Sequence, residues 1–132
     1  MRNAIKFILI VAATLAFLNQ AHAQPAPGTT WVNQRGSVLT IDTIGIDGKF
    51  EGTFVNKAAG FKCQGMPYPV VGWIDGETMG WLVIWNNSYE NCQSVTAWGG
   101  IVVSSSTIET NWVLSSLQTG SSLIGSDTFK MN

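Results

Sequence analysis

The hydrophobic positions beyond residue 28 fall in short runs and show no sustained helical period. Runs rich in Val, Ile, Thr, Phe and Trp alternate with clusters of Gly, Asp, Asn and Ser, a pattern typical of short β-strands joined by turns. The pattern predicts an all-β chain with eight strands, at residues 29–33, 37–43, 49–56, 68–75, 78–86, 94–104, 107–116 and 126–131.

Most connections between these strands are short and carry turn chemistry. The sequences "QRG" at 34–36, "DG" at 47–48 and 75–76, and "SSS" at 104–106 are typical of tight turns. Sequential antiparallel strands in so short a chain favour an up-and-down β-barrel, because closure removes the exposed edges. A two-sheet sandwich is the alternative. An eight-stranded barrel can hold one small ligand inside.

The first 23 residues have the features of a secretory signal peptide. Arg2 and Lys6 precede the apolar run "FILIVAATLAFL", which is followed by the small-residue pattern "AHA". The run is short for a membrane span, and we predict cleavage after Ala23. The expected mature protein is one domain, residues 24–132, that is secreted or periplasmic and not attached to a membrane.

Composition excludes several classes of function for this mature chain. Loss of Arg2 and Lys6 leaves five basic residues against eight acidic ones, a net charge near −3 without a basic cluster, so nucleic acid is not an expected partner. His22, the only histidine, leaves with the signal peptide, which removes imidazole catalysis and the usual zinc sites. No paired carboxylates or phosphate loop appear in the sequence, so we expect no enzyme activity, metal or cofactor.

The two cysteines, Cys63 and Cys92, are expected to form a disulfide, because paired cysteines are the rule in exported proteins. They fall in two of the longer predicted connections, residues 57–67 and 87–93. The bond would tie two loops together at one end of the sheet. By loop entropy it would contribute about 3 to 4 kcal/mol to stability.

Polar residues share strand faces with tryptophans. In "NCQSVTAW" the two-residue period of a strand places Ser94 and Thr96 on the same face as Trp98. Hydroxyls buried beside a large aromatic ring need hydrogen-bond partners. Trp85 and Trp112 mark the inner faces of two further strands. Any one of these tryptophans alone is best explained as core packing, but aromatic walls with a few placed polar groups are what a small-molecule pocket requires.

Three further polar residues have two readings each. Asn33 and Ser37 flank the turn "NQRGS", where both could simply satisfy backbone groups of the turn. Asp127 in "GSDTF" could be an Asx-turn residue at the start of the last strand. A carboxylate there could equally point inward, where it would need hydrogen-bond donors.

Several segments together resemble a known family. "TWVNQRGS", "WLVIWNNSYENCQSVTAW", "TNWVL" and "GSDTF" resemble the avidin and streptavidin family in order, spacing and residue type. "FVNKAAGFKCQGMPYPV" is most similar to the short dimeric branch typified by rhizavidin, whose disulfide joins the loops beside the pocket mouth. The resemblance implies an avidin-like barrel that binds biotin with high affinity, without catalysis, as a homodimer, and sequesters the vitamin or serves defence.

The resemblance also implies roles for the polar residues. Asn33 and Ser37 would donate hydrogen bonds to the ureido oxygen of biotin. Asp127 and Asn56 would accept the two ureido N–H groups.

The remaining implied contacts are with the thioether and the tail of biotin. Thr96 would face the sulfur and Ser94 would bind near the tail carboxylate, so that the ligand completes the hydrogen bonds of these hydroxyls. The aromatic walls would come from three residues, Trp85, Trp98 and Trp112. Trp31 and Trp81 are expected to pack the barrel interior.

Two positions depart from the family pattern. Phe54 replaces a tyrosine that donates to the ureido oxygen in streptavidin, and the lost donor should weaken binding by roughly 1 to 3 kcal/mol. Thr119 stands where family tetramers place a tryptophan that reaches into the neighbouring pocket. Without that lid a dimer is the expected assembly.

Two other classes of function compete with biotin binding. A secreted carbohydrate-binding module would stack sugars on tryptophans, and it predicts an open aromatic platform. An inhibitor on a small barrel would act through a protruding loop, for which residues 57–67 are long enough.

Overall fold

The computed structural model describes residues 24–132, and the predicted signal peptide, residues 1–23, lies outside the described residues. The described chain forms eight strands: β1 (Thr29–Asn33), β2 (Val38–Ile44), β3 (Lys49–Val55), β4 (Pro67–Asp75), β5 (Thr78–Asn86), β6 (Asn91–Ser104), β7 (Thr107–Ser116) and β8 (Ser121–Met131). Within residues 24–132, no helix has the length and hydropathy that a membrane span requires.

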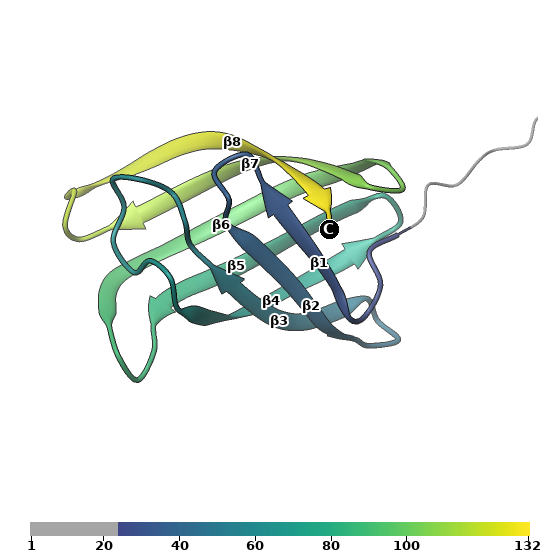
Figure 1. Cartoon of the computed structure of the whole chain (residues 1–132), viewed down its shortest axis with the longest axis horizontal. Helices are drawn as coiled ribbons and strands as arrows, with labels where there is room; N and C mark the ends of the chain where they lie inside the picture. The colour runs from purple at the N-terminus through teal and green to yellow at the C-terminus, as the bar shows by residue number, and fades with distance from the viewer. Residues whose placement is uncertain (1–23) are drawn as a thin grey trace, which may run out of the picture.

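The strands form a closed antiparallel barrel in which each pairs with the next (Figure 1). Closure occurs between β1 and β8, where Trp31 pairs with Met131 and Asn33 with Phe129. The predicted up-and-down barrel is therefore confirmed, and the alternative of a two-sheet sandwich is wrong. A closed barrel leaves no unpaired edge, and its interior is one continuous space.

Alternation along the strands explains what fills that space. In β5 every second residue is buried, including Trp81, Val83 and Trp85, while Leu82 and Ile84 face outward. At one end of the barrel the inward side chains pack into a closed core, formed by Trp31, Leu39, Ile41, Phe50, Val102, Ile108 and Phe129. Trp31 and Trp81 are almost fully buried, as the sequence predicted.

Six strand boundaries differ from the prediction. The last strand begins at Ser121 rather than at residue 126, because the serines that suggest a loop pair across the β7–β8 hairpin up to Ser116. The strand β6 begins at Asn91, since Asn86 pairs with Asn91 beyond a bulge. The other four differences are of one residue each: Ser37 and Asn56 lie just outside β2 and β3, β2 ends at Ile44, and β4 starts at Pro67.

The disulfide between Cys63 and Cys92 is confirmed, with 6.3 Å between the two Cα atoms. Cys63 lies in the β3–β4 connection, as predicted, but Cys92 lies inside β6 rather than in a loop. The bond therefore ties a long connection to a strand of the barrel wall, and not to a second loop.

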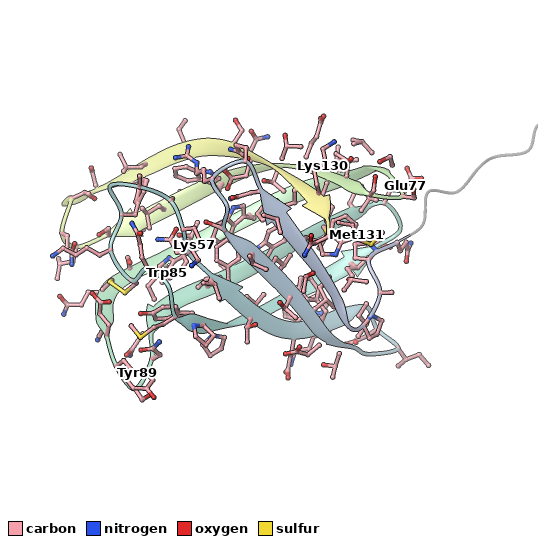
Figure 2. All side chains as sticks on the ribbon, viewed as in Figure 1. Lys57, Glu77, Trp85, Tyr89, Lys130 and Met131 are labelled. Atoms are coloured by element: carbon pink, nitrogen blue, oxygen red, sulfur yellow. A yellow bond between two sulfur atoms is a disulfide. The ribbon has the colours of Figure 1, made fainter. Side chains whose placement is uncertain are left out.

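The two ends of the barrel differ in character. The β1–β2, β3–β4, β5–β6 and β7–β8 connections lie at one end, which we call the loop end (Figure 1). Figure 2 shows Lys57, Trp85 and Tyr89 toward this end, and Glu77, Lys130 and Met131 toward the other. Within residues 24–132 the closed core occupies the far end, so space for a ligand is expected at the loop end.

Candidate functional site

A cavity of about 360 Å³ occupies the barrel interior at the loop end. This volume lies in the range of small-molecule sites. All of the binding residues predicted from the sequence line it: Asn33, Ser37, Phe54, Asn56, Trp85, Ser94, Thr96, Trp98, Trp112 and Asp127. They come from six strands or their connections, so only the closed barrel brings them together.

Asn33 is held in one orientation by the β1–β2 turn. Its Oδ1 accepts hydrogen bonds from the backbone N–H groups of Arg35 (3.0 Å) and Ser37 (2.9 Å). Gly36 adopts a φ of +84°, which permits this tight turn. The prediction that Asn33 satisfies backbone groups of the turn is thus confirmed for its side-chain oxygen. Its amide nitrogen donates to no group in the described chain and remains available as a donor.

Ser37 and Asn56 form the adjoining part of the polar end. Ser37 Oγ accepts a hydrogen bond from the backbone N–H of Lys57 (2.8 Å) and donates a long one to Asn56 Oδ1 (3.5 Å). Asn56 Oδ1 also accepts from the backbone N–H of Ala58 (2.9 Å), and its Nδ2 donates to the carbonyl of Lys62 (3.0 Å). Asn56 therefore holds the β3–β4 connection, and the long Ser37–Asn56 hydrogen bond is one that a ligand acceptor can replace.

Asp127 lies inside β8 with its carboxylate buried, so the Asx-turn reading is wrong. Its Oδ2 accepts from Trp98 Nε1 (3.1 Å) and its Oδ1 from Gln34 Nε2 (2.9 Å). Arg35 Nε lies 3.4 Å from Oδ1. These donors satisfy much of the buried charge, while Oδ2 retains a lone pair for a further donor.

Gln34 and Arg35 also contact Asp127, and neither was predicted as a site residue from the sequence. Gln34 also accepts a hydrogen bond from the backbone N–H of Thr128 (3.0 Å), so it clamps the β1–β2 turn to β8. Only their position in the sequence could have indicated that they belong to the site. Both lie between Asn33 and Ser37 in a tight turn, and residues inside a turn that carries two site residues lie at the edge of that site.

The hydroxyls of Ser94 and Thr96, which share a face of β6 with Trp98, have different surroundings. Thr96 Oγ1 accepts a hydrogen bond from Trp85 Nε1 (2.8 Å), so the expectation that a ligand alone completes its hydrogen bonds is wrong. The buried indole N–H needed an acceptor, and Thr96 opposite Val83 on the neighbouring strand supplies it. Ser94 is half-buried, and its hydroxyl makes no hydrogen bond within the described residues.

Aromatic rings form the inner wall as a continuous stack. Phe54 stacks on Trp98 with ring centroids 4.8 Å apart, and Trp98 stacks on Trp81 at 5.6 Å. Trp85 meets Phe54 edge to face at 5.8 Å. Such contacts fix ring positions before a ligand arrives, because a displaced ring would lose its neighbours.

Trp112 of β7 pairs with Trp98 on the neighbouring strand, so it extends the same wall, and it is half-buried. Phe61 of the β3–β4 connection meets it edge to face at 6.5 Å. The indole lies flat against Gly125 of β8, where a Cβ atom would clash with the ring. Glycine at this position lets Trp112 lie against the barrel wall.

Tyr68 lies behind Trp85, with ring centroids 5.2 Å apart, and is fully buried. Burial, with a smaller effect of the nearby Glu90 carboxylate, raises the pKa of the Tyr68 hydroxyl. Within the described residues, Tyr68 Oη and Trp81 Nε1 are the two buried side-chain atoms without a hydrogen-bond partner. Tyr68 does not line the cavity, so it does not replace the donor that Phe54 lacks.

The described residues offer no evident metal site. One group of three potential ligands lies close together, Cys63, Glu90 and Cys92, but the two sulfurs are bonded to each other.

At the mouth, Thr119 lines the cavity at the position where the family resemblance places a tryptophan in tetramers.

A closed barrel with an aromatic wall and a compact polar end is the architecture of a protein that binds one small molecule. Comparison with known proteins supports a narrower assignment. A sequence model of the avidin family matches residues 21–132. The chain belongs to the avidin family.

Three relatives are similar along most of this chain. Afifavidin from Afifella pfennigii is 42% identical over 117 residues, which cover 85% of this chain and 73% of afifavidin. The structure of short afifavidin in complex with biotin is 43% identical, with a TM-score of 0.73, and the match covers 82% of this chain and 90% of that one.

The other two relatives are shwanavidin and rhizavidin, which are compared here through their crystal structures. Apo shwanavidin is 37% identical with a TM-score of 0.77, covering 83% of this chain and 98% of shwanavidin. The rhizavidin–biotin complex is 36% identical with a TM-score of 0.75, covering 81% of this chain and 92% of rhizavidin. A shwanavidin variant with phenylalanine replaced by alanine is described as a low-affinity mutant.

Proposed function

We propose that this protein binds biotin in the barrel cavity, without catalysis. The observation that carries the proposal is the layout of the polar end. Asn33 Nδ2 is a donor and Asp127 Oδ2 an acceptor with capacity left. If Ser37 Oγ turns its proton from Asn56 Oδ1 to a ligand oxygen, Ser37 becomes a second donor and Asn56 Oδ1 a second acceptor. A cyclic urea has one acceptor oxygen between two N–H donors, which is the complementary set. Membership of a family with biotin complexes of afifavidin and rhizavidin supports the same ligand.

The test is a titration of the purified protein with biotin, followed by tryptophan fluorescence and a dissociation-rate assay. Because Trp85, Trp98 and Trp112 line the cavity, filling it should change their emission. We expect saturation at one biotin per chain and slow release. No change at micromolar biotin, or no saturation, would contradict the proposal.

The carbohydrate-binding alternative finds little support in the placement of the tryptophans. Trp85 and Trp98 are 6% exposed and form walls of a cavity rather than an open platform. Trp73, on the outer face of β4, is 51% exposed and stands apart from them. Titration with a panel of sugars serves as the specificity control for biotin.

We also propose that binding is of high affinity and serves to sequester biotin, or defence, outside the cytoplasm. The disulfide supports an oxidising compartment, because such bonds form and persist in exported proteins. Cell fractionation and N-terminal sequencing of the exported protein test this. We expect a mature chain that begins at Gln24; an intact Met1 in the cytoplasm would contradict export.

Introducing a tyrosine at Phe54 tests the missing donor. Phe54 is 2% exposed and lines the cavity, so Phe54→Tyr should place a hydroxyl near the ureido oxygen. We expect the dissociation constant for biotin to fall by about tenfold, the value of roughly 1.4 kcal/mol for one added hydrogen bond. Competition binding measures the change.

Phe54→Ala is the matched control for this test. It removes the ring that stacks on Trp98 and should weaken binding, in keeping with the low-affinity phenylalanine variant of shwanavidin. Tighter or unchanged binding by Phe54→Ala would show that the ring plays no part in the wall.

We propose that the protein is a homodimer formed through the outer faces of β5 to β8. Strand register places Leu82, Ala97, Val113 and Ile124 side by side across these four strands. Leu82, Val113 and Ile124 are all exposed in the single chain, and a contiguous apolar face of this kind marks an interaction surface. A second copy can cover it with the same face about a two-fold axis.

Val113→Lys tests this interface, because it places a charge at the centre of the apolar row. We expect the variant to be monomeric and the wild type dimeric in size-exclusion chromatography with light scattering. Thr53→Lys, on the outer face of β3, is the control and should remain dimeric. A dimer that survives Val113→Lys would place the interface elsewhere.

A further inference from the structure

The disulfide between Cys63 and Cys92 has a carboxylate beside it. A side-chain oxygen of Glu90 and the two sulfurs all lie within 4.8 Å of one another. Both cysteines are buried, at 2% and 5% exposed, and Glu90 is half-buried. A negative charge therefore lies next to the bond that ties the β3–β4 connection to the barrel wall.

The β5–β6 connection holds Glu90 in this place. Its backbone N–H donates to Asn87 Oδ1 (2.9 Å), and its carbonyl accepts from the backbone N–H of Asn87 (3.0 Å). Glu90 precedes Cys92 by only two residues, so its carboxylate stays near Cys92 even if the β3–β4 connection moves away. The charge also acts on the buried Tyr68 hydroxyl, whose pKa is raised mainly by burial and further by Glu90.

The reaction that opens a disulfide brings a second negative charge to this place. A thiolate forms a new bond to one sulfur of the disulfide, the bond between the two protein sulfurs breaks, and the other sulfur leaves as a thiolate that takes a proton from solvent. The attacking group is thus an anion. A carboxylate within 4.8 Å of both protein sulfurs opposes its approach.

Lys62, the residue before Cys63, is the cation that could offset this effect. Its side chain is exposed and lines the cavity, where solvent screens its charge. Within residues 24–132, no ion pair joins Glu90 to a basic side chain. The charge of the half-buried Glu90 therefore dominates at the sulfurs.

We propose that Glu90 protects the Cys63–Cys92 disulfide from reduction by small thiols that carry a net negative charge. The bond maintains a conformation that the connection would not readily keep without it. Cys63 adopts a φ of +54°, which residues other than glycine rarely do, so the connection can relax once the bond opens. The inference concerns the disulfide alone and does not depend on binding of biotin.

The experiment compares two thiols of different charge as reductants of the folded protein, at pH 8 and low ionic strength. The thiolate of 2-mercaptoethanesulfonate carries two negative charges, whereas in the thiolate of cysteamine an ammonium group balances the sulfur. Alkylation of the freed protein thiol, followed by mass spectrometry, gives each rate constant. The readout is the ratio of the rate constant for the sulfonate thiol to that for the amine thiol. A variant that merely loosens the connection would accelerate both reactions equally and leave this ratio unchanged.

We expect Glu90→Gln to raise the ratio about threefold to tenfold at low ionic strength, because it removes the charge and keeps the shape of the side chain. The increase should disappear at about 1 M salt, where charges a few ångströms apart are screened. Glu109→Gln is the matched control. It removes the same charge from an exposed position on β7 and should leave the ratio unchanged.

An unchanged ratio in Glu90→Gln would overturn the inference, as it would if the disulfide were attacked only after the chain unfolds. An increase that persists at high salt, or an equal increase in Glu109→Gln, would also contradict it, because neither is the effect of a charge placed beside the bond.

Discussion

Replacing Trp98 by alanine is expected to lower both the stability of the barrel and its affinity for biotin more than any other single substitution in the cavity. Trp98 is 6% exposed, stacks between Phe54 and Trp81, and donates to Asp127. Truncation of a buried tryptophan costs about 3 to 5 kcal/mol, which is about 15 to 25 °C in the melting temperature of a domain this size. Loss of this wall should also raise the dissociation constant for biotin about a thousandfold.

Trp98→Phe separates the two contributions of the indole. It keeps an aromatic ring between Phe54 and Trp81 but removes the N–H that Asp127 Oδ2 accepts. We expect an intermediate loss of stability, about 1.5 to 3 kcal/mol, the value of a hydrogen bond to a charged group. Thermal denaturation and biotin competition measure both variants. Equal damage by Trp98→Phe and Trp98→Ala would mean that the hydrogen bond, and not the stacking, dominates.

Removal of the disulfide is expected to have the second largest effect. In Cys63→Ser/Cys92→Ser the unfolded chain loses a cross-link that spans 29 residues, which should lower the free energy of unfolding by about 3 to 4 kcal/mol. The bond also holds the connection that contributes Ala58, Phe61 and Lys62 to the cavity lining. We therefore expect biotin to dissociate several-fold faster, because the bound loop must be ordered at a greater cost.

A reductant provides the control for this variant. Reduction of the wild type should reproduce the lower melting temperature and the faster release, whereas the double variant should not respond. A lower melting temperature with an unchanged release rate of biotin would show that the disulfide stabilises the barrel without shaping the mouth.

Alternation and turn chemistry were sufficient to predict the barrel. In runs such as "TMGWLVIWN" every second residue is buried inside the barrel and the residues between face outward. This two-residue period allowed β5 to be predicted with the correct bounds. The start of the last strand was not, because Ser121 and Ser122 are exposed polar residues that pair with Ser116 and Ser115. A polar, exposed ladder leaves no hydrophobic period in the sequence.

The site was predictable as a set of residues but not as a network. The ten predicted residues share one cavity because strand period and family resemblance fix which side chains face inward. The hydrogen bonds among them depend on contacts distant in sequence, such as Trp85 to Thr96 and Gln34 to Asp127. Arg35 was missed for the same reason, since no local pattern shows that a turn residue reaches a carboxylate 92 positions away.

The even number of strands has a practical consequence for attaching this protein to other molecules. Both described chain ends lie away from the cavity: Gln24 bonds to Gly76 in the β4–β5 turn, and the backbone of Asn132 bonds to Thr30 near the start of β1 (Figure 1). A fusion partner joined ahead of Gln24 or after Asn132 would emerge behind the closed core. Immobilisation through either end should therefore leave the mouth facing solution, which suits the protein to use as an oriented capture reagent.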